Sequence, residues 1–166
     1  MKISLIAAVS ENHIIGRDNK LVWKLKTDMS FFMNTTKGHH VIMGRKNYDS
    51  IPEKWRPLSN RTNIVVTHQQ NLKLEGCEIV HSIKEGLELA RINNEQEVFI
   101  IGGGEIYKQS MDIADKIYYT QVKAIVDGDT YFPEIDFSIW KEESREKYQA
   151  DEGNEYDFDI VTYIRR

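Results

Sequence analysis

Asp28 lies in the stretch whose residue types and spacing most suggest chemistry. In a helix that starts near Lys26, one face carries the positions i, i+3, i+4 and i+7, namely Leu25, Asp28, Met29 and Phe32. Three of these side chains are apolar, and a carboxylate on a buried face is costly unless something pairs with it. No basic residue shares the face. Asp28 therefore either caps the helix or is solvated, or it binds a ligand that carries hydrogen-bond donors. This stretch alone favours the first explanation.

A run of three glycines, Gly102-Gly103-Gly104, lies between an apolar strand and a helix. Glycines let the backbone approach a ligand, and a helix N-terminus presents free N–H groups, so this layout suits a phosphate. A tight turn is an equally good explanation. The run is not a Rossmann fingerprint, because Tyr107 takes the place of the last glycine, and no Gly-Lys-Ser/Thr follows as in a P-loop.

The segment Met43-Gly44-Arg45-Lys46 repeats the order strand, glycine and helix start, now with two cations. Two such sites in one small domain suggest a ligand with more than one phosphate, and a dinucleotide fits. Arg45 is the better partner for a monoester phosphate, because its guanidinium can bind two oxygens.

Composition narrows the classes further. The chain has 166 residues, 40% of them hydrophobic, which suits one domain with one core. Its formal charge of −4, without a Lys/Arg cluster, argues against nucleic acid as a partner. The single cysteine, Cys77, excludes an internal disulfide and fits a reducing, cytoplasmic setting. The five histidines have no metal-ligand spacing, and the apolar run 3–9 is too short for a membrane span.

The elements that must position these residues alternate between strand and helix. Strands are predicted at 3–9, 40–43, 62–67, 78–80, 98–101, 116–122, 140–148 and 156–166, and helices at 26–35, 45–50, 83–91 and 105–111. Residues 10–20 are expected to be a loop. This order predicts a single α/β domain with a mostly parallel central sheet, helices on both faces and an antiparallel C-terminal hairpin that turns at 151–154. Ligands bind at the carboxyl ends of such strands, where loops 10–24, 44–46 and 102–104 should converge.

The ordered motifs resemble those of the bacterial dihydrofolate reductase family over essentially the whole chain. They comprise Ile3–Ala8, Ile15-Gly16, Trp23-x-Leu25-x-x-Asp28-x-x-x-Phe32, Val41–Arg45, Arg56-Pro57-Leu58, Arg61, Ile101–Gly104 with Tyr107, and Gly128-Asp129-Thr130-x-Phe132-Pro133. The resemblance implies one domain, residues 1–166, with an adenosine-binding subdomain at approximately 40–92. It also implies a monomer that uses NADPH and is the target of antifolates such as trimethoprim.

The resemblance implies a role for Asp28 as the carboxylate that binds the 2-amino group and N3 of the pterin. Thr120 would support that contact and Trp23 would hold a water beside it. Arg61 would pair with the α-carboxylate of the glutamate tail. The remaining folate-binding positions implied are Ile6, Ala8, Met29, Phe32, Ile51 and Leu58.

For NADPH, the resemblance implies that Gly102–Gly104 form the pyrophosphate turn, with a cis peptide between the first two glycines. Arg45 would be among the residues around the phosphates and adenosine. The full implied set is Ala8, Ile15, Gly16, Gly44, Arg45, Lys46, Asn47, Thr67, His68, Ile101, Gly102, Gly103, Gly104, Glu105, Ile106, Tyr107 and Thr130.

The implied reaction is hydride transfer from NADPH to C6 of 7,8-dihydrofolate, with protonation at N5, which supplies tetrahydrofolate for one-carbon and thymidylate synthesis. Loop 10–24 would close over the nicotinamide. The chain departs from the family pattern at Val22, Lys26, Asn47 and Glu105. The alternatives are a pyrimidine reductase of riboflavin synthesis on the same fold, which would not need Arg61, and a binding module without turnover.

Overall fold

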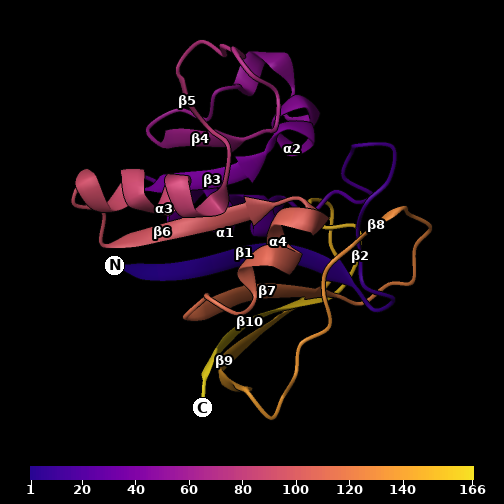
Figure 1. Ribbon diagram of the computed structural model, residues 1–166. Coiled ribbons are helices and arrows are strands. Elements are labelled where there is room, and N and C mark those ends of the chain that lie inside the picture. Colours follow the sequence, from indigo (N-terminus) through magenta and orange to yellow (C-terminus); the bar gives the residue numbers. More distant parts are fainter.

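The computed structural model describes residues 1–166 and contains one large sheet of eight strands in the order β5-β4-β3-β6-β1-β7-β10-β9 (Figure 1). Its strands are β1 (Lys2–Ser10), β3 (His40–Gly44), β4 (Thr62–Val66), β5 (Cys77–Val80), β6 (Glu97–Gly102), β7 (Lys116–Val122), β9 (Trp140–Tyr148) and β10 (Phe158–Arg165). The first six strands in spatial order are parallel, and β10 and β9 close the sheet as an antiparallel pair. The predicted fold class is confirmed.

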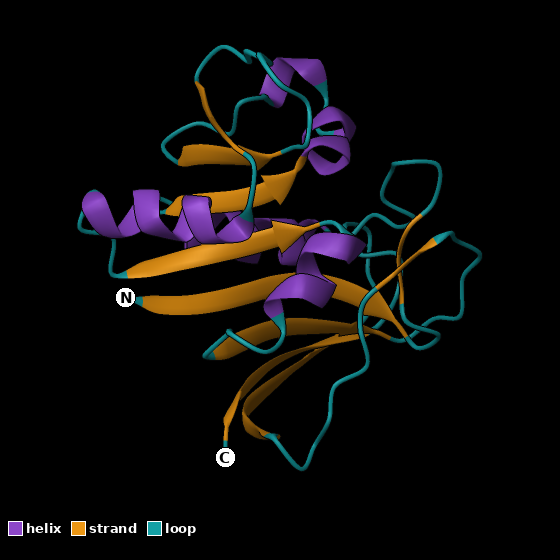
Figure 2. Ribbon diagram, viewed as in Figure 1, coloured by secondary structure: helices purple, strands orange, loops and turns teal.

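Helices cover both faces of the sheet (Figure 2). Helices α3 (Ile83–Ile92) and α4 (Gly104–Ser110) pack on one face, and α1 (Lys26–Thr36) and α2 (Arg45–Ser50) on the other. A short 3-10 helix spans Glu53–Trp55. None of the helices has the length and apolar character that crossing a membrane requires.

Strand β6 shows why the sequence forms this sheet. It lies between β3 and β1, and its apolar run fills both faces, because side chains alternate along a strand. Val98 and Ile100 join the larger core with α3 and α4, whereas Phe99 and Ile101 join the core beneath α1 and α2. The strand that links both cores also ends at the glycine run.

The structure differs from the predicted elements in one functional region. Residues 10–20 were expected to be an unpaired loop, but Ile14–Gly16 forms strand β2, which pairs with β8 (Thr130–Tyr131). The pairing escapes a sequence pattern because both strands are very short and their partners lie far apart in the chain. The predicted helix at 105–111 also begins one residue earlier, at Gly104.

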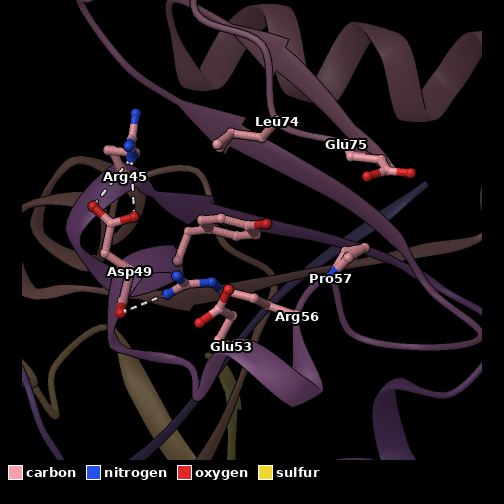
Figure 3. A pocket seen from close by; sticks show the side chains of 9 residues that line it. Arg45, Asp49, Glu53, Arg56, Pro57, Leu74 and Glu75 are labelled. Carbon is pink, nitrogen blue, oxygen red and sulfur yellow. Dashed lines mark hydrogen bonds and ion pairs between the residues drawn. The ribbon is translucent and has the colours of Figure 1, made fainter.

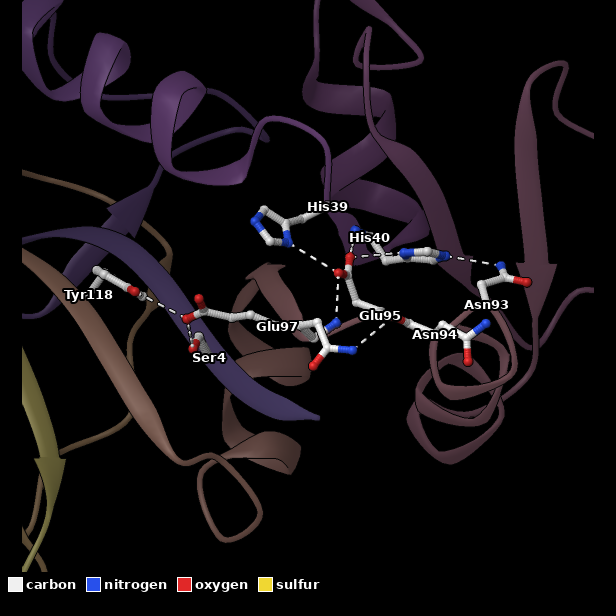
Figure 4. Close-up of polar contacts among 9 residues, drawn as sticks. Ser4, His39, His40, Asn93, Asn94, Glu95, Glu97 and Tyr118 are labelled. Atoms are coloured by element: carbon white, nitrogen blue, oxygen red, sulfur yellow. Dashed lines mark hydrogen bonds and ion pairs between the residues drawn. The ribbon is translucent and has the colours of Figure 1, made fainter.

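At the amino ends of β3 and β6, a polar cluster surrounds Glu95 (Figure 4). Its carboxylate lies 3.1 Å from Nδ1 of His39 and 2.9 Å from Nδ1 of His40, and it accepts the backbone N–H groups of His40 and Gln96. Burial raises the pKa of Glu95, but these hydrogen bonds outweigh burial and hold its pKa below the usual range. The cluster ties the turn before β3 to the turn before β6, at the edge opposite the predicted site.

Candidate active site

The loops that follow β1, β3 and β6 meet at the carboxyl edge of the sheet, as predicted. A Cβ on Gly44 would lie 3.1 Å from Ile106, and one on Gly104 would lie 2.9 Å from the carbonyl oxygen of Tyr131. These close approaches bring the ends of β3, β6 and β8 together. Gly16, Gly44, Gly104 and Thr130, separated widely in sequence, therefore border one region.

Asp28 lies half-buried in the first turn of α1 and is bound to a neighbouring strand. The hydroxyl of Thr120, on β7, donates to Oδ1 of Asp28 at 2.5 Å. Burial raises the pKa of Asp28, and the Thr120 hydrogen bond offsets part of that rise. No cation forms an ion pair with the carboxylate. Asp28 can therefore bind a donor-rich, polar heterocycle without displacing an internal ion pair.

The face of α1 around Asp28 is more open than the sequence suggested. Leu25 is buried, but Met29 is 47% exposed and Phe32 is only half-buried. The expectation of a buried face is therefore wrong for Met29, because the flank of α1 that carries it stays open, whereas Phe31 and Phe32 pack against an apolar cluster of the sheet. The open flank provides an apolar wall beside the carboxylate.

Most of the predicted folate-binding residues gather on the α1 side of the sheet. Ile6, Phe32, Ile51 and Leu58 belong to one apolar cluster that also contains Phe99 and Ile101. Ala8 packs against the neighbouring cluster that contains Trp23, and it pairs with Thr120 across β1 and β7. Trp23 is 8% exposed and packs with Leu25 and Phe158. An apolar surface thus extends from Trp23 toward Leu58.

Arg61 is held at the other end of α1. Its Nε donates to Thr36 Oγ1 at 2.8 Å, and its terminal nitrogens bind the carbonyl oxygens of Ser59 and Met33. Thr36 lies eight positions after Asp28, which corresponds to ~12 Å along a helix. The structure therefore places the held guanidinium of Arg61 at one end of the apolar wall and the Asp28 carboxylate at the other.

The glycine run forms a turn whose backbone is open on one side. The Gly102–Gly103 peptide is cis, as the family resemblance implied. Gly102 has φ +114, and a Cβ there would lie 3.0 Å from the Tyr107 ring, so the position requires glycine. A Cβ on Gly103, by contrast, would meet nothing within 4 Å. The half-buried but unobstructed backbone of Gly103 and the N-terminus of α4 can receive an anion.

Tyr107 and Ile106 support this turn from behind. Both are buried, and the Tyr107 hydroxyl donates to the carbonyl oxygen of Ile6 at 2.6 Å. Burial raises the pKa of Tyr107, and the nearby charge of Asp28 adds to the rise, so the phenol remains a donor. Glu105 is exposed and Ile15 half-buried at the borders of the same region. Direct contact of these residues with a cofactor stays a prediction.

Arg45 has a partner that the sequence reading missed. Its Nε lies 3.1 Å from both carboxylate oxygens of Asp49, which leaves its terminal nitrogens free to bind another anion. The pair borders an open cavity of ≈ 500 Å³ that Arg56 and Leu74 also line (Figure 3). The i, i+4 spacing of Arg45 and Asp49 was the available signal.

The other predicted adenosine-side residues lie around the ends of β3 and β4. Lys46 and His68 are exposed, and Nδ2 of Asn47 lies 3.5 Å from the carbonyl oxygen of Ile101. Thr67 is half-buried, and its carbonyl oxygen lies 2.8 Å from Nδ1 of His81, another residue that the sequence reading did not single out. The structure thus gathers these positions at one sheet edge, and their ligand contacts stay predictions.

Comparison with known proteins assigns essentially the whole chain to one family. A sequence model of the family described as "Dihydrofolate reductase" matches residues 2–165. The dihydrofolate reductase of Staphylococcus haemolyticus is 43% identical over 99% of this chain and 96% of its own length, and that of Bacillus subtilis is 41% identical over 99% and 95%. A solved structure of dihydrofolate reductase from Enterococcus faecalis, complexed with NADP(H) and RAB-propyl, superimposes with a TM-score of 0.90 at 35% identity, covering 99% of this chain and 96% of that one. The chain belongs to the dihydrofolate reductase family, as its sequence motifs indicated.

Proposed function

We propose that this chain catalyses the NADPH-dependent reduction of 7,8-dihydrofolate to 5,6,7,8-tetrahydrofolate. The observation that carries the proposal is the half-buried Asp28 carboxylate beside an apolar wall. It accepts a hydrogen bond from Thr120 and forms no ion pair. A pterin offers a 2-amino group and a ring N–H on one edge, which match the two acceptor oxygens of a carboxylate. Family membership and the E. faecalis complex with NADP(H) support the reaction.

The chain's own residues fit a dinucleotide cofactor. The open backbone at Gly103 and the N-terminus of α4 suit a pyrophosphate, and the free terminal nitrogens of Arg45 suit a monoester phosphate. When bound, NADPH supplies the hydride that reduces the substrate. Ala8, Ile15 and Ile101 then border the nicotinamide, and loop 10–24 excludes water from it.

Asp28 binds and polarises the pterin rather than donating the proton itself. Its carboxylate holds the edge that carries the 2-amino group and N3, whereas N5 lies on the opposite side of the ring system. A water molecule therefore delivers the proton to N5, and Trp23 orders water beside Asp28. Thr120 keeps Oδ1 of Asp28 in place, and both carboxylate oxygens retain lone pairs that can accept from the pterin.

The tail of the substrate extends along α1 toward Arg61. Ile6, Phe32, Ile51 and Leu58 enclose its apolar middle, and Met29 covers the open side. The guanidinium of Arg61, which Thr36 and two carbonyl oxygens hold in place, binds the α-carboxylate of the glutamate. Antifolates that mimic the pterin ring occupy the same part of the site.

We further propose that the protein acts as a monomer in the cytoplasm, and that residues 40–92 form an adenosine-binding subdomain. The single cysteine suits a reducing compartment. Strands β3, β4 and β5 with α2 and α3 make up the proposed subdomain, and they carry Arg45, Thr67 and His68 at one edge.

The test compares wild-type enzyme with Asp28→Asn by following the loss of reduced-nicotinamide absorbance with dihydrofolate. We expect turnover from the wild type and loss of most turnover near neutral pH in a folded Asp28→Asn variant. Near-normal turnover of the variant would contradict the role of Asp28. A wild-type chain that binds NADPH without reducing dihydrofolate would instead favour a pyrimidine reductase or a binding module.

A further inference from the structure

Helix α1 carries Asp28 in its first turn but has no cap of its own. Its N-cap residue is Leu25, which has no side-chain acceptor for the free N–H groups at the helix start. Such a turn frays unless other groups satisfy these donors. Since Asp28 belongs to this turn, whatever caps the helix also determines where the carboxylate lies.

The turn between β9 and β10 supplies the missing cap. The backbone N–H of Lys26 donates to the carbonyl oxygen of Gly153 at 2.9 Å, and that of Thr27 donates to Oδ1 of Asn154 at 3.0 Å. Glu155 extends the contact, because its backbone N–H donates to the carbonyl oxygen of Lys24 at 2.9 Å. A turn 127 residues away in sequence thus closes the first turn of α1.

Asn154 is the side chain of this turn that bonds the first turn of α1 itself, whereas the Glu155 carboxylate accepts from the backbone N–H of Lys24, before the helix, and every hydrogen of the Asn154 amide is used. It is 4% exposed. Its Nδ2 donates to Thr27 Oγ1 at 3.0 Å and to Asp151 Oδ1 at 3.0 Å, while its Oδ1 accepts from the Thr27 backbone. An amide has one acceptor and two donor hydrogens, and here each has a partner. The orientation of Asn154 is therefore determined, and with it that of Thr27, the neighbour of Asp28.

We propose that Asn154 is a positioning residue for Asp28, which holds the first turn of α1 so that the carboxylate meets both Thr120 and the substrate. The proposal rests on the proposed function, because it extends the substrate site to the β9–β10 turn. Without Asn154, the Thr27 N–H loses its acceptor and the turn gains freedom. Water then reaches Asp28, and the burial that raises the pKa of Asp28 diminishes.

The first experiment replaces Asn154 by Ala and follows the Asp28 carboxyl by 13C NMR during a pH titration without ligand, with Asp28→Asn assigning the signal. We expect the pKa of Asp28 to fall toward its usual range. Steady-state kinetics should give a KM for dihydrofolate raised about tenfold, the size expected for loss of a buried hydrogen bond, with a smaller change in kcat. Glu152→Gln is the matched control, because Glu152 is exposed in the same turn and forms no hydrogen bond.

A rescue variant separates positioning from general destabilisation. Asn154→Asp combined with Asp151→Asn exchanges the amide and the carboxylate. The backbone N–H of Thr27 then keeps an acceptor at position 154, and the hydrogen bond between the side chains at positions 151 and 154 can still form. We expect this pair to return the Asp28 titration and the KM most of the way to wild type. If Asn154→Ala does not fold, the same titration on Asn154→Ser takes its place.

A folded Asn154→Ala or Asn154→Ser variant with wild-type Asp28 titration and KM would overturn the proposal, as would a rescue pair that behaves like the Ala variant. The titration needs no substrate. A wild-type chain without dihydrofolate reduction would therefore contradict the proposed function alone, and the positioning role would still be tested.

Discussion

Asp28 carries a charge that is costly where it lies. Burial raises its pKa above the value it has in the unfolded chain. Between these two pKa values the folded state binds a proton that the unfolded state has released, so stability falls as pH rises through this range. Above the folded pKa the ionised carboxylate lowers the free energy of unfolding by a constant amount. The buried carboxylate of Asp28 therefore lowers the stability of the ligand-free protein at neutral pH.

Asp28→Asn should consequently stabilise the ligand-free protein at pH 7 while it removes activity. The amide can still accept the hydroxyl of Thr120, and it has no charge to desolvate. We expect a higher melting temperature than wild type, by about 2–4 °C for each kcal/mol recovered. The difference should diminish toward about pH 3, where the wild-type carboxyl is protonated in both states. Calorimetry of both proteins across this pH range checks the prediction, and a less stable variant at pH 7 would contradict it.

A second prediction for a single residue concerns Arg61 and the binding of the substrate tail. Arg61→Lys keeps the charge but loses the planar group that Thr36 and two carbonyl oxygens hold. We expect the KM for dihydrofolate to rise by about tenfold to hundredfold, as for loss of a charge-assisted hydrogen bond, with little change in kcat. A dihydropterin without the glutamate tail serves as the control substrate, and its KM should not respond to the substitution. An equal rise for both substrates would place the effect elsewhere.

At the scale of elements, the pairing of β2 with β8 ties loop 10–24 to the segment around Gly128 and Asp129. The backbone N–H of Asp129 donates to the carbonyl oxygen of Gly16 at 3.0 Å, and that of Asp18 donates to the Asp129 carboxylate at 3.0 Å. A Cβ on Gly128 would lie 2.3 Å from Cγ2 of Ile14 and 2.7 Å from the carbonyl oxygen of Gly16. The contact between the two loops thus depends on the absence of a side chain at Gly128.

Gly128→Ala should therefore separate β2 from β8. We expect the hydride-transfer rate in single turnovers to fall about tenfold or more, because the loop no longer excludes water from the nicotinamide. Global stability should change much less, since neither Ile14 nor Gly128 belongs to any of the three apolar clusters. Stopped-flow kinetics and limited proteolysis within loop 10–24 measure the two effects. The control is Asp127→Ala, because Asp127 is exposed and precedes Gly128 in the chain. Equal hydride-transfer rates in the wild type, Gly128→Ala and Asp127→Ala would refute the role of the contact.

For the whole molecule, the order of strands brings the two proposed ligand sites together. Strand β6 lies between β3 and β1, so the glycine turn lies between the start of α2, which carries Arg45, and the β1 end that continues into loop 10–24. The same sheet carries Thr120 on β7, next to β1. A cofactor across the β3–β6 end and a substrate beneath α1 can therefore meet near Ala8.

Cofactor binding should stabilise the whole domain by mass action. At a concentration 100 times Kd, NADPH adds about 2.7 kcal/mol to the free energy of unfolding, which raises the melting temperature by roughly 5–10 °C. Arg45→Ala should reduce this shift for NADPH and leave that for NADH unchanged, because only NADPH carries the monoester phosphate. Thermal melts of both proteins with each nucleotide check the prediction. A reduced shift with NADH as well would contradict a selective role for Arg45.

Local sequence patterns determined the central features of this protein. Apolar runs and helical spacing determine the strands and helices, since side-chain direction repeats every two residues in a strand and every 3.6 in a helix. Asp28 on an apolar face, the glycine run and the motif order likewise identified the family and the carboxylate before any contact was known. These features depend on residues that are close in sequence, so the sequence alone can predict them.

Only the tertiary structure decided which distant groups complete the site. The resemblance implied that Thr120 supports the Asp28 contact, but the hydrogen bond between them, across 92 residues, is a tertiary one, and the capping of α1 by Asn154 across 127 residues had no signal in the sequence. The β2–β8 pair and the exposure of Met29 also follow from how the elements pack rather than from their own sequences. Hydrogen bonds between remote segments have no periodic signature, because strand order and packing bring their partners together only when the whole sheet has formed.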